Sequence, residues 1–166
     1  SVSGTALVNV VRGDTNALLD NTTVKNGNVS IKAQDTNTLN GILGGITASG
    51  IAAATGYVNE NSTVNTTSAK ITNSTIGSED KRTGDVDVEA SSTNNIASMS
   101  ASVGVAGTGA NVQGLAITNQ NSANTEAKIE NSNITAESLD VAAKNTFNVF
   151  DLIAAAGVSG VGGQVG

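Results

Sequence analysis

The feature that most constrains this chain is an internal repeat. Three segments align without gaps and share the pattern Ala-x-aliphatic-x-Asn-Ser/Thr-x-Val/Ile. They begin at Ala17, Ala69 and Ala127, which are 52 and then 58 residues apart. Self-similarity at such a spacing is typical of repeat architectures, in which one unit cannot bury its apolar face alone but stacked units can.

A second block follows each copy, and its alternation predicts a strand. The pattern x-aliphatic-x-aliphatic-x-Ala recurs in residues 28–33, 85–90 and 138–143. In the middle copy, Val86 and Val88 lie on one face of such a strand and acidic residues lie on the other. The Gly- and Ala-rich stretch that completes each unit also alternates, so it predicts a further strand with small side chains.

The composition favours strands over helices. Val and Ile together number 29 against 8 Leu, and there is no Pro. Branched side chains suit strands, and Pro would remove an N–H that the sheet needs. We therefore predict an all-β fold, a parallel β-helix (β-solenoid), in which each strand pairs with the turns of chain above and below it.

The repeat spacing also gives an expected size. We expect one solenoid segment over residues 1–166, a fragment of a longer protein, with imperfect repeats at about 1–52, 53–110 and 111–166. Four or five short strands per unit would make two or three coils. The chain would then form roughly six to nine coils, spaced about 4.8 Å apart.

Two sets of repeat positions are expected to be structural. The three first alanines should occupy equivalent corners of one column. Asn21, Asn73 and Asn131 have the phase of inward residues, so we expect them at a bend with their amides bonded to neighbouring backbone or to each other. Most of the extra length of the second unit lies in the polar stretch 77–84, which predicts an outward loop.

The composition excludes several classes of function. The chain has no His and no Cys, which closes the usual serine hydrolase, cysteine protease and zinc-site chemistries. A net charge of -6 disfavours a nucleic-acid partner. No apolar stretch is long enough to span a membrane, so membrane insertion is not expected. Neither a metal nor another cofactor is predicted.

Three runs of the sequence resemble a known family. The runs AKIENSNITAESLDVAAKNTFNV (127–149), AKITNSTIGSEDKRTGDVDVEASSTNNI (69–96) and ASVGVAGTGANVQGLAITNQNSANTEAKI (101–129) are similar to repeats of leukotoxin-type adhesins. These belong to the filamentous haemagglutinin-like group of Gram-negative bacteria. The resemblance covers essentially the whole chain and depends on repeat character, with no catalytic signature.

The resemblance implies a fold and a setting. It implies a right-handed parallel β-helix, type V export through the outer membrane by a dedicated transporter, and display on the bacterial cell surface as a long fibre. It further implies a virulence-associated, non-catalytic role in cell adhesion, with a host-cell receptor or glycan as the partner. In such fibres much of the length is shaft.

One tripeptide is a candidate receptor contact. Arg12, Gly13 and Asp14 form an integrin-type sequence, which related adhesins are known to carry. They fall where the other copies have Asn-rich stretches, so we expect a tight exposed turn. The alternative is that Gly-Asp is ordinary turn chemistry.

Other hypotheses rest on fewer residues. The loop at Glu79 together with Asp85, Asp87 and Glu89 could hold a cation or contact a partner, or could be a solvated surface. A glycan-cleaving enzyme would need convergent acids and aromatic platforms, and the chain has only three aromatic residues. A trimeric autotransporter-like adhesin head and an ice- or carbohydrate-binding solenoid are further alternatives.

Overall fold

The computed structural model is built of parallel strands. It describes residues 1–160 and 164–165, so 161–163 and 166 lie outside the described residues. The strands are β1 (Val2–Asp20), β2 (Thr23–Val24), β3 (Val29–Ser49), β4 (Ala53–Thr72), β5 (Thr75–Ile76), β6 (Thr83–Ala106), β7 (Asn111–Glu130), β8 (Asn133–Ile134), β9 (Ala136–Ser159) and β10 (Gln164–Val165). The all-β prediction with parallel sheets is confirmed. The described residues contain no helix that could cross a membrane.

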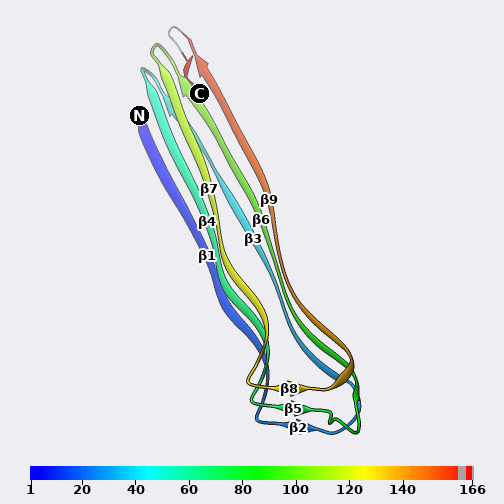
Figure 1. Cartoon of the computed structure of the whole chain (residues 1–166). Coiled ribbons are helices and arrows are strands. Elements are labelled where there is room, and N and C mark those ends of the chain that lie inside the picture. Colours follow the sequence, from blue (N-terminus) through cyan, green and yellow to red (C-terminus); the bar gives the residue numbers. More distant parts are fainter. Residues whose placement is uncertain (161–163, 166) are drawn as a thin grey trace.

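Three sheets stack the chain on itself in order of sequence. They run β1-β4-β7-β10, β2-β5-β8 and β3-β6-β9. Each turn of chain therefore consists of a long strand, a short strand and a second long strand. Figure 1 shows the two long sheets side by side, with the short strands crossing between them at one end.

Each repeat makes one turn, so the expected two or three coils per repeat, and six to nine coils in all, are wrong. The first residues of β4 and β7, Ala53 and Asn111, pair with each other, and they are also where the second and third repeats begin. The difference arises because the long strands run for 19 to 24 residues. The Asn-rich stretches that suggested turns continue the strands instead.

The half of the molecule nearest the short strands has a conventional core. We call it the base and define it as residues 12–39, 65–96 and 123–149. Ile71, Ile76 and Val88 are fully buried there. The other buried members of this core are Val29, Ala33, Ala69, Val86 and Ala90. Val86 and Val88 point inward and the acidic residues that alternate with them point outward, as the alternation of residues 85–90 predicts. Toward the arm the interior becomes polar, with Asn65 and Asn94 buried and the carboxylate of Asp35 accepting from Asn65.

In the other half, polar side chains are frequent at inward positions and apolar ones at outward positions, although Leu43, Tyr57 and Leu115 also point inward. We call this half the arm and define it as residues 1–11, 40–64, 97–122 and 150–160; it ends at the bends 50–52 and 107–110. Inward positions of β6 in the arm are the buried Ser98, Ser100 and Ser102. Outward positions are apolar and exposed, among them Met99 and Val103. Of the 8 basic and 14 acidic side chains, the arm contains only Glu60 and Asp151.

Candidate functional site

The three alanines form one column, as predicted, but they lie within β1, β4 and β7 and not at corners. Ala17 pairs with Ala69, and Ala69 pairs with Ala127. Ala69 is fully buried and packs in the apolar core of the base. The later positions of each unit align as well: Ala33 with Ala90 and Ala143, Thr36 with Thr93 and Thr146, and Leu39 with Ile96 and Val149.

The asparagine corners are at a bend, but their side chains are not buried. Asn21, Asn73 and Asn131 have φ of 48°, 50° and 48° and are exposed. Asn tolerates this left-handed conformation better than most residues, and the conformation turns the side chain outward. The expectation of inward amides is therefore wrong. Asn73 instead donates to the carboxylate of Asp20 at 2.9 Å.

The Ser or Thr that follows each of these asparagines points inward in its place. Ser74 is buried, donates from Oγ to the carbonyl of Thr72 at 2.7 Å, and accepts the N–H of Thr22 at 3.1 Å. Ser132 accepts the N–H of Ser74 at 3.0 Å in the same way. Each hydroxyl thus connects two turns at a corner where the sheet pairing is interrupted.

The candidate receptor tripeptide is not in a turn. Arg12, Gly13 and Asp14 lie within β1, paired with residues 64–66 of β4. The expected tight turn is wrong because the strand continues through this position. All three residues are exposed, and Arg12 and Asp14, two residues apart on a strand, point to the same side. They belong to the strand at one edge of its sheet.

The polar insertion is an outward loop, as predicted. Ser78 and Lys81 bond through their backbones at 2.8 and 3.1 Å, and residues 78–82 are exposed. Gly77, at the start of the loop, has φ of 76°. The extra residues of the second unit therefore lie outside the stack.

The acidic residues that follow this loop are paired with a lysine. Lys32 Nζ lies 2.6 Å from Asp87 and 3.0 Å from Glu89, and these two carboxylates raise the pKa of Lys32 to about 12. Asp85 accepts a hydrogen bond from Ser138 at 2.6 Å. Within the described residues, no group of three or more acids is placed to hold a metal ion.

A second set of charges lies on the outer face of β4 and β7. Lys70 bonds to Glu126 at 2.8 Å and lowers the pKa of that carboxyl. Glu130 contacts Lys128 and raises the pKa of the ammonium. These half-exposed pairs at the surface belong to the base, and surface pairs contribute little stability individually.

The interior of the arm contains a network of amides and hydroxyls, with the carboxylate of Asp151 at one end, that the hydrophobic pattern of the sequence did not reveal. Asn9 donates to Asn61 at 2.9 Å, and Asn61 donates to Asn119 at 3.1 Å, so the three form a ladder across the turns. Asn61 also donates to Ser98 of the facing sheet at 2.8 Å. The signal was available, because these asparagines have the spacing of 52 and 58 that the alanines have.

Glycines on one long sheet make room for the large inward side chains of the other. A Cβ on Gly41 would lie 2.6 Å from the Oδ1 of Asn61 and 2.7 Å from that of Asn59. Gly45 faces the ring of Tyr57 in the same manner. The two sheets of the arm can approach closely only because these positions have no side chain.

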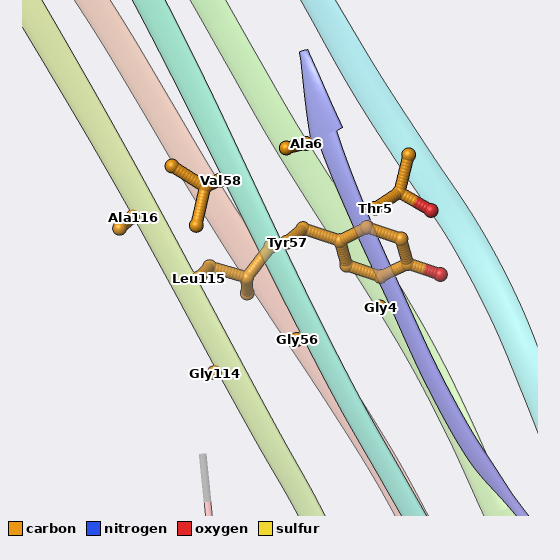
Figure 2. A pocket seen from close by; sticks show the side chains of 9 residues that line it. All are labelled: Gly4, Thr5, Ala6, Gly56, Tyr57, Val58, Gly114, Leu115 and Ala116. Atoms are coloured by element: carbon orange, nitrogen blue, oxygen red, sulfur yellow. The ribbon is translucent and has the colours of Figure 1, made fainter.

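The outer face of β1, β4 and β7 carries a shallow hollow of about 670 Å³. Figure 2 shows the residues that line it, including the aligned glycines Gly4, Gly56 and Gly114. Val58 and Ala116 flank this row on the next outward positions. None of the nine lining residues in Figure 2 carries a charge, and the polar side chains among them are the hydroxyls of Thr5 and Tyr57.

No protein-family model matches the chain, and no curated protein or solved structure matches it.

Proposed function

We propose that the chain is a structural and adhesive segment of a large secreted fibre on the bacterial cell surface, without catalytic activity. The observation that best supports this is the stacking register, which places each repeat directly on the one before. Such a stack can be extended by further turns of the same kind without a change of geometry. Its mechanism is geometric, because a stiff stack holds contact sites away from the cell.

The finer parts of the proposal follow from the family resemblance. They are right-handed coiling, type V export by an outer-membrane transporter, and contact with a host-cell receptor or glycan. A nucleic-acid partner and membrane insertion are not part of it.

The test is adhesion by the isolated chain. Beads coated with the chain should bind cultured host cells more than beads coated with albumin at the same density. Binding equal to the albumin control would contradict the adhesive part of the proposal. Electron micrographs of the full-length protein should show unbranched rods, and globular particles would contradict the fibre.

One alternative is a receptor-binding module, and the exposure of Arg12 and Asp14 on one side of β1 favours it. Arg12→Ala or Asp14→Glu should then lower adhesion to integrin-bearing cells at least fivefold. Asn16→Ala, an exposed change on the same strand, is the matched control. Full adhesion by both variants would remove this alternative. A trimeric head would have three times the chain mass in solution, and a smaller mass would exclude it.

A further inference from the structure

One outer face of the arm is apolar and unpartnered. It consists of the outward side chains of residues 42–48 of β3, 97–105 of β6 and 150–158 of β9, and we call it the apolar face. Its large members are exposed by 40% to 78%, among them Ile42, Ile46, Met99, Val103, Phe150 and Leu152. Within these ranges every outward residue is aliphatic, aromatic, Met, Ala or Gly.

We propose that the apolar face is a dimer interface, on which the same face of a second copy packs. A face of three strands and about ten residues measures roughly 14 by 33 Å, from strand spacing and rise. Two such faces would bury about 1,000 Å² in total, the lower limit for a specific interface. The largest contiguous apolar patch on a soluble protein is often functional at this size.

The charges next to the apolar face fix the relative orientation of the two copies. The same sheet continues into the base, where its outward side chains include four carboxylates and two ammonium groups. The carboxylates are Asp85, Asp87, Glu89 and Asp140, and the ammonium groups are Lys32 and Lys144. In a parallel dimer these net-negative surfaces would face each other. An antiparallel dimer overlaps only the uncharged arms and leaves each base in solvent.

The opposite outer face supplies a matched control. Val103 lies on the apolar face and is 40% exposed, and Val64 lies on the outer face of β4 and is 38% exposed. A lysine at position 103 would place a charge within the interface, whereas a lysine at position 64 would remain in solvent. The two substitutions alter the monomer similarly, so a difference between them reports on the interface.

The first experiment measures self-association by sedimentation equilibrium. The parent chain should form a dimer with a dissociation constant in the micromolar range or weaker. Val103→Lys should raise that constant at least tenfold, and Val64→Lys should leave it within twofold. A chain that stays monomeric, or one whose association Val103→Lys does not weaken, overturns the proposal. Flotation of the chain with phosphatidylcholine vesicles, in place of dimer formation, also overturns it.

The second experiment tests the orientation, using the absence of cysteine from the chain. Ala101 is at the middle of the apolar face on β6, so Ala101→Cys should cross-link to itself with a short bismaleimide. Thr93→Cys, on the same side of β6 but in the base, should not. Cross-linking at both positions overturns the antiparallel arrangement, and cross-linking at neither overturns the interface. The proposal does not depend on adhesion, so it can hold where the adhesive function fails.

Discussion

The base and the arm use the same backbone ladder with different side-chain patterns, because the inward positions are more apolar in the base and more polar in the arm. In the base, Ile71 and Val88 are inside and the Lys32 cluster is outside; in the arm, Asn61 and Ser98 are inside and Val103 is outside. Both halves lie on the same continuous strands. Identical polar side chains in register can hydrogen-bond to each other, just as apolar ones can pack together. The comparison therefore teaches that the stacking of equivalent turns specifies the fold, whichever kind of side chain lies inside.

The two halves should therefore be stabilised by different free-energy terms. Apolar burial contributes most in the base, at roughly 25 cal/mol per Å² of surface. The arm depends on hydrogen bonds, each contributing about 1 kcal/mol net. Substitutions that place a polar side chain in the apolar core of the base, or remove one from the polar network of the arm, test this difference.

The largest effect is expected from a polar residue in the base. Ile71→Asn removes a fully buried aliphatic side chain and leaves an amide without a partner among apolar neighbours. Together these should lower the free energy of unfolding by about 4 kcal/mol. Urea denaturation measures the change. Leu18→Asn, at an outward position exposed by 63%, is the control and should change it by less than about 0.5 kcal/mol.

A comparable effect should follow from breaking the ladder in the arm. Asn61→Ala leaves Asn9, Ser98 and Asn119 without their shared partner. The expected loss is about 3 kcal/mol, since buried polar groups become unpaired. Amide hydrogen exchange should show the loss of protection confined to the arm. Gln120→Ala, an exposed change in the same sheet, should have little effect, and an equal loss in both variants would contradict the ladder.

The repeat made much of the base predictable from sequence. The gapless alignment placed Ala17, Ala69 and Ala127 in one column, and the alternation of residues 85–90 identified the inward Val86 and Val88. Such local patterns can be read from sequence because the spacing of apolar residues along a strand decides which face is buried. The number of coils was not predictable in this way. Asn and Gly usually indicate turns between strands, whereas here they lie within long strands.

The arm was not predictable from hydrophobic pattern, because many of its apolar side chains point outward. Met99 and Val103 alternate with serines as regularly as Val86 and Val88 alternate with acids, so the pattern alone does not say which face is inside. The corner asparagines were misplaced for a similar reason: a single left-handed residue such as Asn73 changes the phase of the side chains.

A smaller effect should separate the inner and outer surfaces of the arm. Gly41→Ala places a methyl group against Asn59 and Asn61, and overpacking of this kind costs about 1 to 2 kcal/mol. Gly56→Ala, on the outer face, meets no atom within 4 Å and should be neutral or slightly stabilising. Thermal unfolding of the two variants measures the difference. Equal melting temperatures would mean that the two sheets of the arm are not closely packed.

The smallest effect is a pH dependence confined to the base. Hydrogen bonds from Thr72 and Asn73 lower the pKa of Asp20 below its ordinary value of 3.8. Because the folded-state pKa is lower than the unfolded one, this stabilisation is fully present above about pH 4 and is lost as the pH falls through the folded value. Asp20→Asn should flatten that part of the stability profile.

Residue-resolved hydrogen exchange between pH 5 and pH 2.5 separates this effect from general acid unfolding. After correction for the intrinsic exchange rate, protection near Thr72 should fall in the parent chain and change less in Asp20→Asn. The direct partners of Asn61 are neutral, and the ladder meets a carboxylate at its end, where Asn119 donates to Asp151 at 2.7 Å. Protection at Asn61 should therefore change less than protection near Thr72 over the same range. Loss of protection in the arm before the base would reverse the comparison, since the charged groups concentrated in the base would then not set the acid sensitivity of the stack.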